Sequence, residues 1–163
     1  MTLLLHSIGD KDNSNYNTRE EIKNSDDVLT FDGVYRNVYE NKDVLVGKKI
    51  LFFVIGNHIG GDNSFDHPMP LERFCEWNEL EEMKQDFNAE IGWHTWSHKD
   101  LTTLSYDEIV KEITPPFPMK KLSYPYGRFN EDVLRAVREV GFDEAFSVTD
   151  GDNSQYQRLR KYL

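Results

Sequence analysis

The side chains best suited to chemistry in this chain follow its short apolar runs. Asp32 ends the run Val-Leu-Thr-Phe, His94 ends the run Glu-Ile-Gly-Trp, and His6 follows three leucines. Tyr126 comes directly after the run Leu-Ser-Tyr-Pro. If these runs are parallel strands, their carboxyl ends open on one rim of a sheet or barrel, which is where such folds bind ligands. We therefore expect these four residues, distant in sequence, to meet at one site.

His94 and His98 are four residues apart, which places both imidazoles on one side of a chain that begins to coil after its strand. Neutral imidazole binds divalent zinc, and also nickel, cobalt or iron. Two histidines hold a metal weakly, and Asp32 is the nearest candidate for a third ligand by topology. Such a metal would lower the pKa of bound water from about 15.7 toward about 7 and polarise a carbonyl, which is the chemistry of amide or ester hydrolysis.

Each of these residues also has a structural interpretation. A lone histidine is more often a structural side chain than a ligand, and Asp32 could cap the turn that follows its strand. His58 and His67 fall in a loop rich in Gly, Asn and Pro, and we expect them to face solvent. Trp96 is suited to packing, although aromatic faces also suit sugar rings, and the segment Tyr124–Gly127 is typical of a turn.

Short apolar runs alternate with amphipathic segments along the whole chain, which is typical of βα units around a mostly parallel sheet. The predicted strands lie near residues 2–6, 28–32, 49–55, 90–94, 121–125 and 144–148. The sequence therefore predicts an α/β fold with helices between the strands.

Three of the expected helices have clear periodicity or terminal signals. Residues 71–87 repeat large apolar side chains at helical spacing. A second helix is predicted to begin with the capping box at Ser105 and to end before the proline pair that starts at Pro115. A third is capped by Asn130 and ends at Gly141.

The remaining segments carry weaker signals. A fourth helix is predicted within residues 34–46, stopped by Gly47. Residues 7–27 are rich in Asn, Asp and Ser and are predicted to form a long loop with a helical turn near 19–23. The residues after Ser154 are predicted to form a polar tail.

Composition limits the classes of partner. The chain has 163 residues, the size of one domain (residues 1–163), and a formal net charge of -10. No segment gathers the Lys and Arg side chains that neutralise phosphates, so nucleic acid and anionic membrane surfaces are not expected partners.

Cys75 is the only cysteine, which excludes an intramolecular disulfide and predicts a small buried side chain. Only three consecutive leucines precede His6, far short of a membrane span or signal peptide, which predicts a soluble, cytoplasmic protein. The oligomeric state is left open.

Taken together, four motifs resemble those of the polysaccharide deacetylases of the NodB-homology type, carbohydrate esterase family four. The motifs are Leu29-Thr-Phe-Asp32, Phe52-Phe-Val-Ile-Gly56, Ile91-Gly-Trp-His-Thr-Trp-Ser-His98 and Tyr124-Pro-Tyr-Gly127. Their order and spacing agree over roughly residues 28–148. The resemblance implies a distorted, incomplete (β/α) barrel and the metal-assisted removal of N-acetyl groups from amino sugars.

The resemblance also implies roles for individual residues. Asp32 matches the catalytic base, and His94 and His98 match the two metal-binding histidines. The backbone N–H of Tyr126 matches the oxyanion donor, a group typically worth about a hundredfold to a thousandfold in rate. In the family, the catalytic acid is usually a histidine on a late strand, and no histidine follows His98 here. The segment Leu-Leu-Leu-His6 is similar to that motif moved to the front of the chain, as in circularly permuted members that resemble exopolysaccharide deacetylases. The resemblance therefore implies His6 as the acid. The predicted substrate contacts are Tyr124, Pro125, Tyr126 and Trp96.

Two positions depart from the family pattern. Gly33 stands where members usually carry a second aspartate that binds metal, and Ser123 stands where many carry an arginine that orients the base. The sequence leaves three outcomes open: Asp32 moves onto the metal, Asn37 or another group substitutes, or no metal binds.

The leading hypothesis is therefore a metal-dependent hydrolase that removes an N-acyl group from an amino sugar in surface polysaccharide or sugar-precursor metabolism. The alternative is a catalytically degenerate sugar-binding or scaffolding protein that kept the barrel and lost the metal site. A third hypothesis is a metal hydrolase for a different acyl group or a small cyclic amide. Cytoplasmic residence would favour a sugar nucleotide, a lipid-linked amino sugar or a free small molecule over an extracellular polymer.

Overall fold

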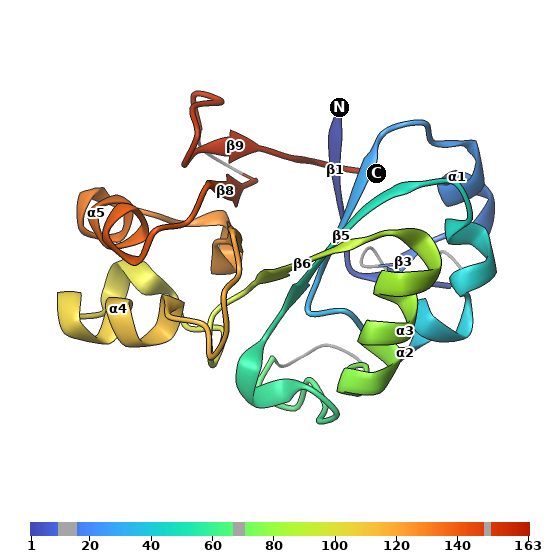
Figure 1. The fold of residues 1–163 in the computed structure, drawn as a ribbon, viewed down its shortest axis with the longest axis horizontal. Helices are drawn as coiled ribbons and strands as arrows, with labels where there is room; N and C mark the ends of the chain where they lie inside the picture. The colour runs from blue at the N-terminus through green and yellow to red at the C-terminus, as the bar shows by residue number, and fades with distance from the viewer. Residues whose placement is uncertain (10–15, 67–70, 149–150) are drawn as a thin grey trace.

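A computed structural model describes residues 1–9, 16–66, 71–148 and 151–163, and its centre is a parallel sheet surrounded by helices (Figure 1). Successive neighbours in this sheet are β1 (Thr2–Leu5), β4 (Val28–Asp32), β5 (Lys49–Val54), β6 (Glu90–Trp93), β7 (Lys121–Ser123) and β8 (Glu144–Ser147). Every pair is parallel. The six predicted strands are confirmed, and each ends at its predicted residue or one or two residues earlier.

The last segment of the chain joins the two edges of this sheet. Strand β9 (Arg158–Leu159) pairs with β8, and β10 (Lys161–Tyr162) pairs with β1 on the opposite edge. The predicted polar tail is therefore wrong, because these polar residues form the strand that closes the barrel; in Figure 1 this red segment runs from β8 to β1. Since β9 and β10 share one strand position, the sheet is the distorted, incomplete (β/α) barrel that was predicted, with fewer positions than a complete eight-stranded barrel.

Two of the predicted helices are confirmed with their caps. Helix α4 (Tyr106–Ile113) begins with the capping box of Ser105 and ends at Thr114, before the proline pair. Helix α5 (Glu131–Val140) is capped by the Asn130 side chain and ends at Gly141, whose backbone is left-handed.

The other helices differ from expectation in their bounds. Helix α3 (Trp77–Phe87) begins six residues later than predicted, because Arg73 and Phe74 form bridges to Asp62 and Tyr35 instead of helical turns. The predicted helix within 34–46 divides into α2 (Arg36–Glu40) and a 3-10 turn (Lys42–Leu45). The predicted loop contains α1 (Arg19–Asn24) and a two-stranded sheet of β2 (Ser7–Ile8) and β3 (Tyr16–Asn17). None of the described helices is long and apolar enough to cross a membrane.

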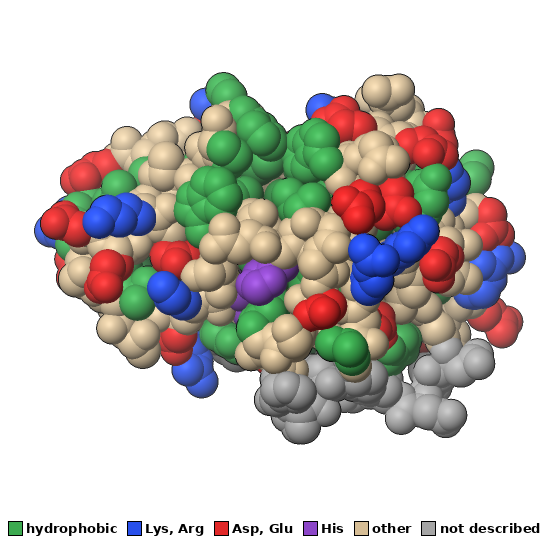
Figure 2. Space-filling view, turned by 90° about the horizontal axis from the view of Figure 1, so that it is seen from below, with side chains coloured by type: hydrophobic (Ala, Val, Ile, Leu, Met, Phe, Trp, Pro, Cys, Tyr) green, Lys and Arg blue, Asp and Glu red, His purple; other side chains and the backbone are tan. Residues whose placement is uncertain are grey.

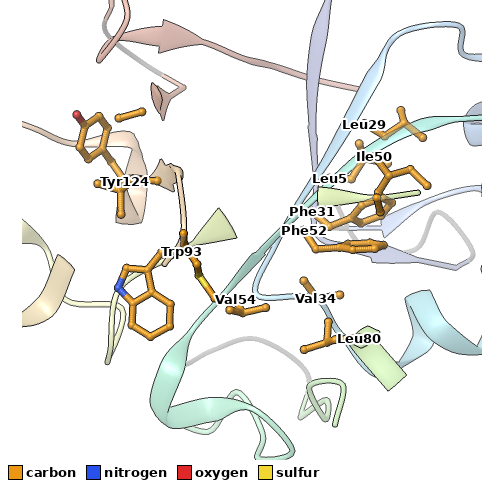
Figure 3. Packing of buried hydrophobic residues seen from close by; sticks show 14 of the residues in the cluster. Leu5, Leu29, Phe31, Val34, Ile50, Phe52, Val54, Leu80, Trp93 and Tyr124 are labelled. Carbon is orange, nitrogen blue, oxygen red and sulfur yellow. The ribbon is translucent and has the colours of Figure 1, made fainter. Parts of the chain in front are cut away.

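Alternation along the strands divides the apolar side chains between two faces. In β5, Ile50, Phe52 and Val54 belong to the cluster that also contains apolar residues of the helices, and they lie between the sheet and those helices (Figure 3). Leu51 and Phe53 alternate with them and form a separate cluster inside the barrel, together with Phe146 of β8. Both faces are buried, which explains why the strands appear in the sequence as nearly continuous apolar runs.

The same alternation brings polar residues into the barrel. In β4, Leu29 and Phe31 belong to the outer cluster, so Thr30 and Asp32 face the interior. Burying an unpaired carboxylate is costly, so Asp32 requires a partner within the barrel.

Candidate active site

Inside the barrel, Asp32 belongs to a layer of four polar residues that come from three different parts of the sheet. Thr30 and Asp32 come from β4, Ser123 is the last residue of β7, and Arg160 lies between β9 and β10. All four are buried, with Asp32 the most exposed at 6%.

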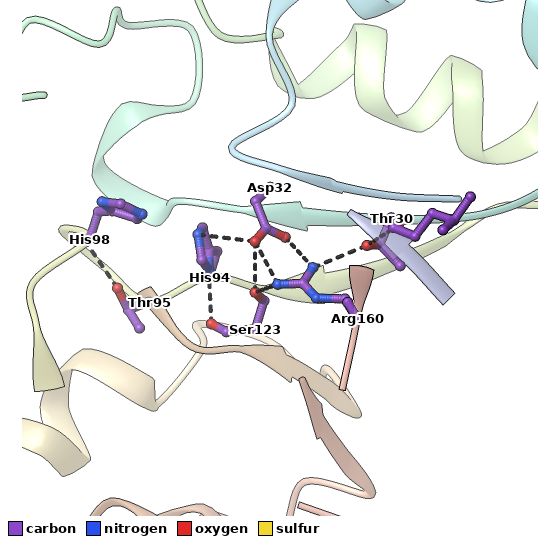
Figure 4. Close-up of polar contacts among 8 residues, drawn as sticks. Thr30, Asp32, His94, Thr95, His98, Ser123 and Arg160 are labelled. Carbon is purple, nitrogen blue, oxygen red and sulfur yellow. Dashed lines mark hydrogen bonds and ion pairs between the residues drawn. The ribbon is translucent and has the colours of Figure 1, made fainter. Parts of the chain in front are cut away.

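Arg160 and Asp32 form a two-pronged ion pair (Figure 4). Arg160 Nη1 donates to Asp32 Oδ1 at 2.7 Å, and Nη2 donates to Oδ2 at 2.7 Å. The Ser123 hydroxyl donates to the same Oδ2 at 2.9 Å and accepts from Arg160 Nη2 at 2.7 Å. The parallel fork fixes the plane of the carboxylate as well as its charge.

These contacts decide the ionisation of Asp32. Burial alone would raise its pKa, but the Arg160 guanidinium, followed by His94, lowers the pKa of Asp32 well below its ordinary value. Asp32 is therefore ionised at any pH near neutrality, which makes it an acceptor of protons and excludes it as a proton donor.

His94 is held by the backbone of the neighbouring strand. Its Nδ1 lies 2.8 Å from the carbonyl oxygen of Ser123, which only accepts, so Nδ1 carries the proton. The other ring nitrogen, Nε2, lies 3.7 Å from Asp32 Oδ2 with its lone pair available. This arrangement, one nitrogen bonded to a carbonyl and the other open, is typical of metal-binding histidines.

His98 lies beside His94, with ring centroids 4.8 Å apart, so the structure brings the two imidazoles together as predicted from their spacing. The backbone N–H of His98 donates to Thr95 Oγ1 at 3.1 Å. Thr95, His98 and Tyr126 all have left-handed backbones, with φ of 68°, 56° and 58°. Left-handed residues other than glycine cost free energy and concentrate at functional sites.

The two imidazoles fit a divalent cation. Burial lowers the pKa of His94 and, together with His94 itself, lowers the pKa of His98 to about 3, so both rings are neutral near pH 7. His98 Nδ1 is buried and has no hydrogen-bond partner among the described residues. Within the described ranges, no three His, Cys, Asp or Glu side chains are grouped closely enough to hold a metal by themselves. The protein can thus offer a metal two nitrogen ligands, leaving other positions to water, substrate or a further residue.

His6 joins the same site from the end of β1. It lines the two adjoining cavities at the carboxyl ends of the strands, about 40 and 180 Å³ in volume. The residues that line both are His6, Asp32, Asp66, His94 and His98. Burial lowers the pKa of His6, while Asp32 opposes that shift. In the space-filling view, histidine is visible in a hollow bordered by apolar side chains (Figure 2).

The predicted substrate contacts have different surroundings. Tyr126 lines the larger cavity and is 48% exposed. Tyr124 and Pro125 are buried, and the Tyr124 hydroxyl donates to the carbonyl oxygen of Tyr156 at 2.9 Å. Trp96 packs edge-on against Trp93 and is not among the described residues that line either cavity.

Other candidate residues lie elsewhere. The Asn37 side chain donates to Ser7 and Glu72 at 3.0 and 3.1 Å and is not among the described residues lining the cavities. His58 is half-buried and stacks on Phe65 at 4.1 Å, so it faces solvent only in part. His67 lies outside the described residues. Cys75 is buried, as predicted.

A larger hollow of about 610 Å³ lies at the opposite end of the barrel, where the strands begin. Four of its charged side chains pair with one another: Lys121 contacts Glu90 at 2.9 Å, and Arg158 contacts Glu144 at 3.1 Å. Because ligand sites of such barrels lie at the carboxyl ends, this hollow is not the candidate active site.

Sequence reasoning missed Arg160, Asp66 and Tyr162. Asp66 lines both cavities, and Tyr162, 65% exposed, lines the larger one. The signal that could have found Arg160 was the missing arginine at Ser123, since a buried Asp32 requires a cation from another part of the chain.

The fold and the site thus define a (β/α) barrel with an ionised carboxylate and two neutral imidazoles at the carboxyl ends of its strands, where such barrels bind their ligands. This chain belongs to the polysaccharide deacetylase family, whose model matches residues 19–145.

Individual relatives agree with that assignment. The peptidoglycan-N-acetylmuramic acid deacetylase PdaA of Bacillus subtilis (strain 168) is 30% identical over 132 residues, covering 72% of this chain and 44% of that protein. The chain thus spans about half the length of the curated relatives it matches. The fold is similar to that of IcaB from Ammonifex degensii, with a TM-score of 0.77, 16% identity and coverage of 99% and 90% of the two chains. It is also similar to the Streptococcus pyogenes deacetylase PplD, solved in complex with acetate, with a TM-score of 0.76, 16% identity and coverage of 99% and 91%.

Proposed function

We propose that this chain is a metal-dependent hydrolase that removes an N-acyl group, foremost acetyl, from an amino sugar. The observation that carries the proposal is the ionised carboxylate of Asp32 beside the neutral imidazole of His94, 3.7 Å away, at a cavity also lined by His98 and His6. The family supports the reaction class, since the relative PdaA is a deacetylase of an N-acetylated sugar.

In this proposal, His94 and His98 hold the divalent cation, with zinc preferred and nickel, cobalt or iron as alternatives. When bound, the cation would polarise the acyl carbonyl and make the attacking water more acidic. Asp32 is better suited to act as a base than as a third ligand, because Arg160 already binds both of its oxygens.

The protein residues divide the proton transfers between them. Asp32 accepts the proton of the attacking water; its low pKa makes it a weak base, so the reaction depends on a water of increased acidity. The backbone N–H of Tyr126 donates to the oxyanion, a contribution typically worth about a hundredfold to a thousandfold. His6 donates a proton to the leaving amine, and its lowered pKa makes its protonated form a strong acid.

The rim of the larger cavity supports a sugar as the substrate. Tyr126 and Tyr162 line it and expose 48% and 65% of their surface, and aromatic faces stack on the apolar faces of sugar rings. Tyr124 and Pro125 would act by shaping the turn that presents Tyr126, and Trp96 by supporting the histidine segment. The substrate we propose is a small-molecule or lipid-linked amino sugar.

The alternative, a sugar-binding or scaffolding protein without a metal, was motivated by Gly33 and Ser123. The serine at position 123 gives this alternative less support, because Arg160 contacts the Asp32 carboxylate from another part of the sheet and Ser123 adds a hydrogen bond to it.

The test is the release of acetate by the purified protein, loaded in turn with zinc, cobalt and nickel. The substrates are a free N-acetylated amino sugar, a sugar nucleotide, a lipid-linked sugar and an N-acetylated oligosaccharide. We expect release from at least one, abolished in Asp32→Asn. No release from any of them with any metal, by protein shown to be folded, would contradict the proposal. One metal per chain that is lost in His94→Ala would exclude the metal-free alternative.

A further inference from the structure

Arg160 is unlike the other cationic residues of the protein. Among the described residues, it is the only lysine or arginine that is buried. It stands between β9 and β10, in the segment that joins the two edges of the barrel. Its guanidinium lies over the Phe53 ring at 5.4 Å, so the side chain extends into the barrel interior. A polar segment at the end of the chain thus places a cation at the centre of the fold.

The contacts of this guanidinium converge on one carboxylate. Arg160 donates to both oxygens of Asp32 at 2.7 Å, although the two residues are 128 positions apart. It also donates to Ser123 Oγ and Thr30 Oγ1, at 2.7 and 3.1 Å, which are the two hydroxyls of this layer. A planar fork bound to both oxygens fixes the rotation of the carboxylate, which a single hydrogen bond from Ser123 cannot do.

We propose that Arg160 is the positioning residue for Asp32: the strand that closes the barrel delivers the guanidinium that holds the base in its reactive orientation. The catalytic meaning of this role rests on the proposed function, whereas the orientation itself can be tested without any activity. Without the fork, Asp32 would be free to rotate toward the imidazole of His94, 3.7 Å away, and away from the proton it is meant to accept.

The experiment compares three variants of the chain. Arg160→Met removes the guanidinium but keeps a long side chain, and Arg160→Lys keeps the charge but loses the fork. The exchange variant Arg160→Ser/Ser123→Arg returns a guanidinium to the same layer from β7. Arg158→Met is the matched control, because Arg158 is in the same closing segment but pairs with Glu144 at the other end of the barrel. Crystal structures and steady-state kinetics are determined for each.

We expect the Asp32 carboxylate to rotate out of place in Arg160→Met and to return in the exchange variant. A displacement of about 1 Å costs about a hundredfold in rate, so kcat should fall by about that factor in Arg160→Met with KM little changed. Arg160→Lys should lose less, the exchange variant should regain about tenfold or more over Arg160→Met, and Arg158→Met should keep the wild-type kcat.

Two results would overturn the proposal. One is an unmoved Asp32 with a wild-type kcat in Arg160→Met; the other is a folded exchange variant in which neither the orientation nor the rate returns. If Arg160→Met does not fold, Arg160→Lys and the exchange variant decide by the same criteria. If the wild-type protein releases no acyl group from any substrate, the proposed function fails, and the orientation of Asp32 in the crystal structures still decides this proposal.

Discussion

Gly33 is the position at which to test why this chain lacks a second acidic residue after Asp32. Gly33→Asp would place a carboxylate next to the candidate metal site, and we expect it to destabilise the protein without tightening metal binding. Gly33 is buried, its φ is +81°, and an added Cβ would lie 2.8 Å from Cε1 of Phe74. The backbone that follows β4 is therefore shaped for glycine.

The magnitude of the destabilisation follows from two costs. A side chain in a left-handed backbone costs about 1–2 kcal/mol. Insertion of atoms into a packed region costs about 1–3 kcal/mol, and the Phe74 ring cannot move away freely because it is stacked on Tyr35 at 4.6 Å. We therefore expect Gly33→Asp to lower the free energy of unfolding by about 2–5 kcal/mol, with Gly33→Ala close behind.

Urea denaturation followed by tryptophan fluorescence measures this loss, and calorimetric titration with zinc measures metal affinity. Gly33→Asn separates the effect of charge from that of shape. A double-mutant cycle with Phe74→Ala isolates the steric part, because removal of the ring should recover that part and leave the backbone cost.

The reasoning would be refuted by a Gly33→Asp protein as stable as the wild type that binds zinc more tightly. Equal losses in the presence and absence of the Phe74 ring would refute the steric part alone.

Four further predictions concern the site and the core. His94→Ala should weaken zinc binding by more than about a hundredfold, measured by equilibrium dialysis and elemental analysis, since loss of a mere outer-shell partner already costs about 10–100-fold. Asp32→Asn should reduce kcat by about 10²–10⁴-fold in the acetate-release assay while the protein stays folded. In the metal-free protein, His98 titrates at about 3 in the native state and near 6.5 when unfolded, so the unfolded chain holds the extra proton between these values. The contribution of His98 to the free energy of unfolding should therefore be fully present above about pH 6.5 and fall by up to about 1.4 kcal/mol per pH unit below it. In urea unfolding measured at several pH values, the free energy of unfolding of His98→Gln should depend on pH less steeply than that of the wild type by this amount. Burial raises the pKa of the Cys75 thiol to about 12, so an aromatic disulfide reagent should modify it no faster than the protein unfolds.

The strands could be predicted because both of their faces are buried. A strand such as β5 needs apolar side chains inside and outside the barrel, so it stands out in the sequence as a continuous run. The caps of α4 and α5 are equally local, since Ser105, Asn130 and Gly141 act on their own helix ends. Signals that depend on adjacent residues were therefore sufficient for this part of the fold.

The start of α3 and the role of the last segment depend on distant residues. Apolar spacing continues upstream of Trp77, but Phe74 is held by a bridge to Tyr35 and by ring stacking, which no helical pattern reports. The segment after Ser154 has too few apolar residues to be recognised as a strand. It becomes one because β8 and β1 each present an edge to it.

The convergence of His6, Asp32 and His94 could be predicted because each ends a recognisable strand. The partner of Asp32 could not, since Arg160 lies 128 positions away in a segment without a strand signal, and it reaches Asp32 from the strand position that closes the barrel. The serine at position 123, where many family members carry an arginine, indicated that a cation had to come from elsewhere but not from which residue.

The energetics of buried ion pairs indicate why the barrel contains the polar layer around Asp32 and Arg160. Replacement of a buried pair by well-packed apolar residues is often neutral or stabilising, because the cost of removing two charges from water offsets their attraction. This barrel already shows the apolar solution beside this layer, where Leu51, Phe53 and Phe146 form an interior cluster and the Phe53 ring lies under the Arg160 guanidinium. Stability alone therefore gives no reason to keep Asp32 and Arg160 at the carboxyl end, with Arg160 Nε left without a hydrogen-bond partner among the described residues. An ionised carboxylate that is fixed in orientation next to two imidazoles is better explained by a role in proton transfer than by a role in stability.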